Sequence, residues 1–145
     1  MKAAVTWVVV TDASRARFFE RLGVAGKLIE LGDRGMTAPA PLASRDRPPR
    51  VHDRMGAARH IIEPRLTPRG AAQARFLASV GDAINEAAAR GAFDKLAICA
   101  PPRALGLLRD RLSDIAKKRV TMALHKDFIH DPVDALQAHL DALAP

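Results

Sequence analysis

The stretch VTWVVVTDASRARFFE, residues 5–20, decides the fold that the sequence predicts. Its first part, residues 5–11, is a continuous run of β-branched and aromatic side chains, which is typical of a strand covered on both faces. The segment DAS favours a turn, because Asp and Ser side chains bond the nearby backbone. Residues 15–20 then predict a second strand with Ala16 and Phe18 on one face. The chain therefore opens with an antiparallel pair of strands.

Downstream of this pair the sequence predicts a third antiparallel strand, followed by three helices that alternate with two strands. Glycines, prolines and capping residues separate these elements. In chain order they are a strand at 27–32, a helix that starts at Thr67 and Pro68 and ends at Gly91, a strand at 95–100, a helix at 101–118, a strand at 120–125 and a helix capped by Asp131.

Apolar spacing predicts which side chains of the later elements face the core. One stripe of the helix at 101–118 carries Leu105, Leu108, Leu112 and Ile115. Alternation in the strand at 120–125 places Val120, Met122 and Leu124 on one half-buried face.

The order of the elements predicts a single three-layer α/β domain over residues 1–145. Three meander strands followed by right-handed crossovers place the first strand beside the fourth. The expected result is a five-stranded mixed sheet of order 3-2-1-4-5, which is a ribonuclease-H-like layout. A length of 145 residues and a hydrophobic content of 48% suit one core of this kind.

The amino-acid composition indicates which cellular compartment and which classes of binding partner to expect. The one cysteine, Cys99, excludes an intrachain disulfide and favours a reducing cytoplasm. No apolar run reaches the roughly 18 residues that span a bilayer, so we expect no membrane insertion. The formal net charge of +7 favours polyanionic partners, such as RNA or the ribosome. Trp7 lies in the first strand and is expected in the core rather than on a base-stacking surface.

Much of the positive charge falls in one segment. Residues 35–68 are rich in proline and arginine and lack periodicity, so we expect a long, mobile basic loop inserted within the domain. Such a segment can contact phosphates and become ordered on binding. Its candidate contacts are Arg45, Arg47, Arg50 and Arg54. A solvated loop without a binding role is the alternative.

Asp12 is a candidate catalytic acid, because ribonuclease-H-like nucleases carry a metal-binding carboxylate on the first strand. A two-metal site needs several convergent carboxylates, and Glu20 and Asp94 do not obviously converge with Asp12. Asp12 accepting backbone N–H bonds in a turn is the alternative. His125 and His130 are a conceivable metal pair, with surface histidines as the alternative. The sequence contains no nucleotide-binding, zinc-binding or nucleophile motif, so we expect no cofactor.

Three segments together resemble the bacterial host attachment protein family, which is named for a requirement in the attachment of plant-associated bacteria to host cells. They are WVVVTDASRARFFE at 7–20, APPRALGLLRDRLS at 100–113 and HKDFIHDPVDALQAHL at 125–140. That family is in turn similar to the central domain of archaeal and eukaryotic release factors and of Pelota-type ribosome-rescue proteins. The resemblance implies a ribonuclease-H-like fold and a connection with translation.

Release factors of this type hydrolyse peptidyl-tRNA with a Gly-Gly-Gln loop that leads into a helix. Here TPRGAAQARF at 67–76 leads into the first predicted helix, which makes Gln73 the matching candidate. Ala71 and Ala72 replace the two glycines and lack their backbone freedom. Gln73 also falls inside the predicted helix rather than in a loop.

The leading hypothesis is a non-enzymatic cytoplasmic factor that binds RNA or the ribosome and affects host attachment indirectly. Asp12 is expected to anchor the first turn, while Arg15 and Arg17 point outward. With Arg103 and Lys126, which follow the later strands, they are expected to form a basic rim that contacts phosphates.

Two alternatives remain open at this point. One is a hydrolase that acts on nucleic acid, either a peptidyl-tRNA hydrolase through Gln73 or a metal nuclease through Asp12. The other is a protein-interaction module that uses the basic loop to bind a protein partner. Salt dependence separates the second alternative from RNA binding, because phosphate contacts weaken steeply as ionic strength rises.

Overall fold

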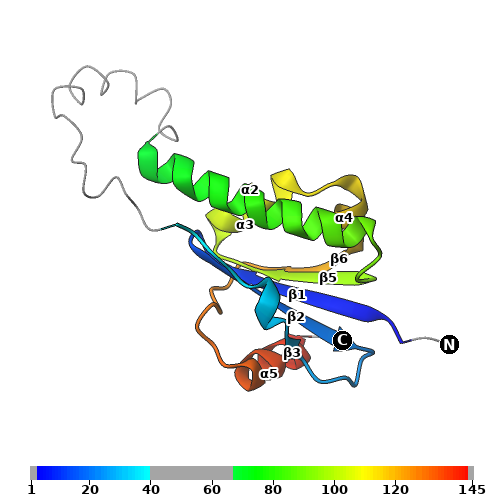
Figure 1. Cartoon of the computed structure of the whole chain (residues 1–145). Helices are drawn as coiled ribbons and strands as arrows, with labels where there is room; N and C mark the ends of the chain where they lie inside the picture. Colours follow the sequence, from blue (N-terminus) through cyan, green and yellow to red (C-terminus); the bar gives the residue numbers. More distant parts are fainter. Residues whose placement is uncertain (1–2, 40–66, 144–145) are drawn as a thin grey trace, which may run out of the picture.

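The computed structural model describes residues 3–39 and 67–143, which form an α/β domain built on one mixed sheet (Figure 1). The elements are β1 (Val5–Thr11), β2 (Arg15–Leu22), β3 (Ile29–Glu30), the 3-10 helix η1 (Gly32–Arg34), β4 (Met36–Thr37), α2 (Pro68–Ala89), β5 (Lys95–Cys99), α3 (Pro102–Arg111), α4 (Asp114–Arg119), β6 (Val120–Leu124) and α5 (Val133–Leu143). The expected α/β class and mixed sheet are confirmed. None of the described helices is long and apolar enough to cross a membrane.

The strands lie in the order β3-β2-β1-β5-β6, with β4 also paired to β2. β1 is antiparallel to β2 and parallel to β5, and β5 is parallel to β6. The sheet has six strands rather than the expected five, because Met36 and Thr37 pair with Ala16 and Arg15. The predicted loop at 35–68 is therefore wrong at its start, and residues 40–66 lie outside the described part of the chain.

Helices cover both faces of the sheet. Figure 1 shows α2, α3 and α4 on one face and α5 on the other. Along β1, Trp7 and Val9 face the core under α2, α3 and α4, whereas Val8 and Val10 face the core under α5. This arrangement explains why β1 is apolar at successive positions, and it confirms that Trp7 is a core residue, 2% exposed.

α2 begins and ends where the sequence predicts, because capping residues mark both of its ends. The Thr67 hydroxyl accepts the Gly70 N–H at 3.0 Å, and Pro68 begins the helix. The helix ends before Gly91, whose φ of 73° is the left-handed conformation that glycine adopts without strain.

The strand predicted at 27–32 is limited to Ile29 and Glu30. The Leu28 N–H donates instead to Gln137 Oε1 on α5, at 3.0 Å, and the Leu28 side chain is buried in the core under α5. The chain therefore joins the sheet only after Leu28.

The single helix predicted at 101–118 is wrong, because the chain breaks into α3 and α4. The Asn85 side chain on α2 accepts the Ser113 N–H at 2.8 Å and donates to the Arg111 carbonyl oxygen at 3.1 Å. The Ser113 hydroxyl caps α4 by accepting the Ala116 N–H at 3.2 Å. As a result Ile115 leaves the predicted apolar stripe and is 48% exposed.

The predicted common face of Val120, Met122 and Leu124 is also wrong. The pairing with β5 shifts by one residue between Leu96 and Ala97, which is a β-bulge. Val120 therefore packs toward α2, α3 and α4, while Met122 and Leu124 pack toward α5.

Candidate functional site

The parallel strands β1, β5 and β6 end at one edge of the sheet, which we call the carboxyl edge and define as residues 12–15, 100–103 and 125–127. In open α/β sheets, ligands usually bind outside the carboxyl ends of the strands. Arg15, Arg103 and Lys126 all lie at this edge, and all three are exposed. Strand direction thus brings together three of the four described residues of the predicted rim.

Both described ends of the basic segment lie near this edge. The Ala38 N–H donates to the Ser14 carbonyl oxygen at 2.7 Å, and Figure 1 shows the first turn of α2 on the same side of the domain. Arg45, Arg47, Arg50 and Arg54 lie outside the described residues.

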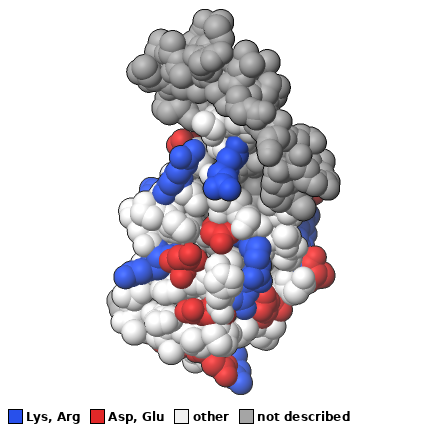
Figure 2. Space-filling model, turned by 90° about the vertical axis from the view of Figure 1, so that its left-hand side faces the viewer, with Lys and Arg blue, Asp and Glu red and all other residues white. Residues whose placement is uncertain are grey.

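Figure 2 views the carboxyl edge and shows Lys and Arg side chains interspersed with Asp and Glu. The arrangement offers separate cations rather than a continuous positive patch. It therefore suits discrete contacts with individual phosphates.

Arg17 does not point outward as predicted. Its Nη1 donates to the carbonyl oxygens of Ile129 and Asp131 at 3.0 and 2.6 Å, while Nε and Nη2 donate to Glu30 at 3.0 and 2.9 Å. The guanidinium carbon also lies 5.0 Å from the centre of the Phe19 ring. With its side chain 12% exposed, Arg17 connects β2 to the segment before α5.

Asp12 anchors the turn between β1 and β2. Its Oδ1 accepts the backbone N–H groups of Ser14 and Arg15, both at 2.8 Å, and the Ser14 hydroxyl at 3.2 Å. An Asp side chain that bonds the following backbone in this way fixes a tight turn.

The carboxylates that a nuclease would need are spread along the strands. Asp94 Oδ2 accepts the Val5 N–H at 2.8 Å and Glu20 Oε2 accepts Trp7 Nε1–H at 3.3 Å, so both contact the first half of β1. Asp12 follows the end of that strand. Over residues 3–39 and 67–143, no three His, Cys, Asp or Glu residues gather in a way that could hold a metal ion, and this includes His125 and His130.

Replacing Asp12 by Ala is expected to lower the free energy of unfolding by about 1–2 kcal/mol, because two turn N–H groups lose a charged acceptor. Urea unfolding followed by the fluorescence of Trp7, the single tryptophan, measures this. The matched control is Asp110→Ala on the exposed face of α3, which is expected to stay within about 0.5 kcal/mol of the parent. Equal losses in the two variants would contradict the anchoring role.

Two further residues that could take part in chemistry, Gln73 and Cys99, lie within a helix and a strand. Gln73 lies within α2, as expected, so its backbone is helical rather than looped. Cys99 is fully buried, and burial raises the pKa of its thiol to about 11. Because the thiolate is the reactive form, Cys99 is a core residue rather than a nucleophile at neutral pH.

A family model described as "Protein required for attachment to host cells" matches residues 7–140. The matched range runs from β1 into α5 and contains every residue of the carboxyl edge. Among curated proteins, none matches this chain.

Proposed function

We propose that this chain, which belongs to the family of proteins required for attachment to host cells, is a non-enzymatic cytoplasmic factor that binds RNA or the ribosome. An effect on attachment would then be indirect, through translation. The observation that carries the proposal is the placement of Arg15, Arg103 and Lys126, from three separate segments, along the same carboxyl edge.

The chemistry of this edge favours phosphate contacts. Arg103 occupies the first turn of α3, where the positive end of the helix dipole adds to its own charge. Lys126 follows β6, and the segment after it is held by Asp127, whose Oδ1 accepts the Ile129 N–H at 3.2 Å. Arginine and lysine side chains on such supports can contact phosphates along a nucleic-acid backbone.

The sequence extends the proposed surface beyond the described residues. Arg45, Arg47, Arg50 and Arg54 belong to the segment that connects Pro39 to Thr67, and both of these residues are described. We also propose that the domain has a ribonuclease-H-like fold, as in release factors. The antiparallel β1–β2 pair followed by the parallel strands β5 and β6 supports this assignment. A domain of that kind on the ribosome would contact RNA.

Co-sedimentation with ribosomes and polysomes, at low and high salt, tests the proposal. The edge variant carries Arg15→Ser, Arg103→Ser and Lys126→Ser. It is expected to bind ribosomes at least about tenfold more weakly at low salt. The slope of the logarithm of the binding constant against the logarithm of the salt concentration is expected to become about 2 units less steep, because three single-strand phosphate contacts are lost.

Two further variants complete this experiment. The loop variant replaces Arg45, Arg47, Arg50 and Arg54 by Ser and is expected to weaken binding in the same salt-dependent way. The control variant removes three exposed cations of α3 and α4, namely Arg109, Lys117 and Lys118, and is expected to sediment like the parent. Protein that stays at the top of the gradient at both salts, or equal losses in the edge and control variants, would contradict the proposal.

A further inference from the structure

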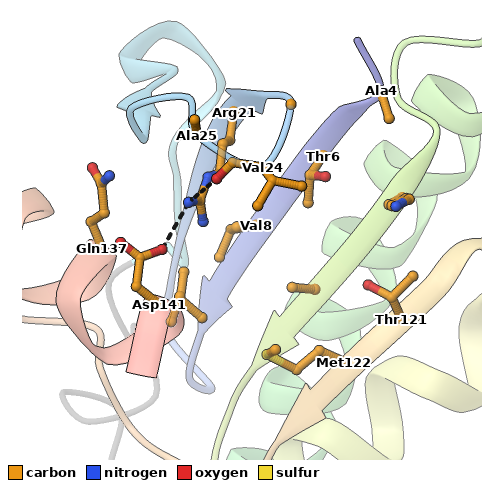
Figure 3. Close-up of a pocket in the computed structure, with 14 residues that line it drawn as sticks. Ala4, Thr6, Val8, Arg21, Val24, Ala25, Thr121, Met122, Gln137 and Asp141 are labelled. Carbon is orange, nitrogen blue, oxygen red and sulfur yellow. Dashed lines mark hydrogen bonds and ion pairs between the residues drawn. The ribbon is translucent and has the colours of Figure 1, made fainter. Parts of the chain in front are cut away.

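A groove of about 560 Å³ lies beside α5, on the face of the sheet opposite α2, α3 and α4 (Figure 3). Leu136 and Leu140 of α5 are buried with Val8 and Phe19, so the helix covers the β1 and β2 side of this face. The β5 and β6 side is left open beside it. The groove lies toward the amino ends of the parallel strands, away from the carboxyl edge.

The strand register places two rows of side chains, one polar and one apolar, on the floor of the groove. Thr6 pairs with Arg21 on one side and Lys95 on the other, and directly paired side chains share a face of the sheet. Two residues further along β1, Val8 pairs with Ala97, and Ala97 pairs with Met122. A hydroxyl and cationic row therefore lies next to an apolar row.

The charges around the groove leave one cation without an ion pair. Arg21 Nη2 donates to Asp141 Oδ1 at 2.8 Å and to the Val24 carbonyl oxygen at 2.6 Å, so Asp141 balances its charge. Among the described residues, Arg21 Nε is a buried donor with no acceptor. Lys95 is exposed and forms no ion pair with any described residue. The groove therefore carries a net charge of one positive unit, from Lys95.

The size of the groove decides what kind of ligand fits. Small-molecule sites usually have volumes of about 300–1,000 Å³ and combine an apolar lining with a few polar groups. The volume of the groove, with Val8, Ala97 and Met122 next to Thr6 and Lys95, is therefore that of a small-molecule site.

We propose that this groove binds a free, single-chain carboxylic acid. The carboxylate lies against Lys95 and Thr6, where the positive charge is not balanced by an acid. The alkyl chain lies over Val8, Ala97 and Met122, where it removes apolar surface from water. This site is separate from the carboxyl edge, so its test is independent of the RNA proposal.

Nuclear magnetic resonance titration of the full chain, with octanoate as the probe, tests this site. Octanoate is expected to shift the amide signals of Thr6, Lys95 and Thr121 in a saturable way. Acetate carries the charge without the chain, and octyltrimethylammonium carries the chain with the opposite charge. Both are expected to bind at least about tenfold more weakly than octanoate.

Three variants separate charge from shape. Lys95→Glu is expected to weaken octanoate binding at least about tenfold and to reverse the preference toward octyltrimethylammonium. Thr121→Phe, at an exposed position that lines the groove, is expected to weaken both probes by filling the space. Lys118→Glu on α4 makes the same charge change outside the groove and is expected to bind octanoate like the parent.

Two results would overturn the proposal. One is octanoate shifts that do not saturate or that spread over both faces of the domain. The other is equal octanoate affinity in Lys95→Glu and Lys118→Glu. The dispersion of the remaining amide signals shows whether each variant is folded, so loss of binding is not confused with unfolding.

Discussion

Arg17→Ala is expected to lower the free energy of unfolding by about 2–3 kcal/mol, because two backbone carbonyl oxygens lose a charged donor and a partly exposed ion pair is broken. The substitution leaves Glu30 without its cation and removes the donor shared by the carbonyl oxygens of Ile129 and Asp131. It also removes the packing of the guanidinium on the Phe19 ring. Because these partners come from β2, β3 and the segment before α5, one side chain connects three parts of the fold.

Arg15→Ala is the matched control, since Arg15 begins the same strand and is exposed. Its effect is expected to stay within about 0.5 kcal/mol. Arg17→Lys keeps the charge but not the planar fork, so it is expected to recover only part of the loss. Urea unfolding of the three variants measures these differences, and similar midpoints for Arg15→Ala and Arg17→Ala would show that the contacts of Arg17 contribute little.

The Arg17 contact also carries a pH signature. Hydrogen bonds from Arg17 hold the pKa of Glu30 below its usual value of 4.5. A carboxyl group whose pKa is lowered by folding stabilises the fold above its unfolded pKa, and that stability is lost as pH falls through the folded pKa. The stability gap between the parent and Arg17→Ala is therefore expected to narrow from about pH 6 to about pH 3. A gap that stays constant with pH would exclude a contribution from the ionised Glu30.

Elements with local signals were predictable from the sequence. The apolar run of β1, the Asp12 turn and the Thr67 cap of α2 each depend on neighbouring residues, and the structure confirms them. The placement of Arg15, Arg103 and Lys126 at one edge of the sheet depends on strand direction, which the predicted crossovers supplied. That part of the candidate site was therefore accessible before the structure.

The predictions for Arg17 and for a single helix at 101–118 were wrong because both depend on contacts between residues far apart in the sequence. The carbonyl acceptors of Arg17 lie 112 and 114 residues downstream, and Asn85 acts on Ser113 from 28 residues away. Alternation along β2 contains a signal for Arg17, because residues two apart share a face and Phe19 is apolar. The groove beside α5 had no such signal, since it depends on how much of the sheet one helix covers.

Leu108→Ala is expected to lower the free energy of unfolding by about 2–5 kcal/mol, the range for removing a leucine side chain from a packed core. Leu108 on α3 is fully buried. Its Cδ1 lies against Gly81 of α2, 3.6 Å from the position that a Cβ there would occupy. Because the helices meet closely at a glycine, the site has little freedom to close around the lost side chain.

Ile115→Ala provides the comparison that tests the break between α3 and α4. A continuous helix places Leu108 and Ile115 on one stripe, seven residues apart, and both substitutions would then be costly. In the structure Ile115 is 48% exposed, so Ile115→Ala is expected to stay within about 0.5 kcal/mol of the parent. Alanine also forms helix more readily than isoleucine, which offsets part of the lost contact. Comparable losses in the two variants, measured by urea unfolding, would favour the continuous helix over the break that Asn85 and Ser113 stabilise.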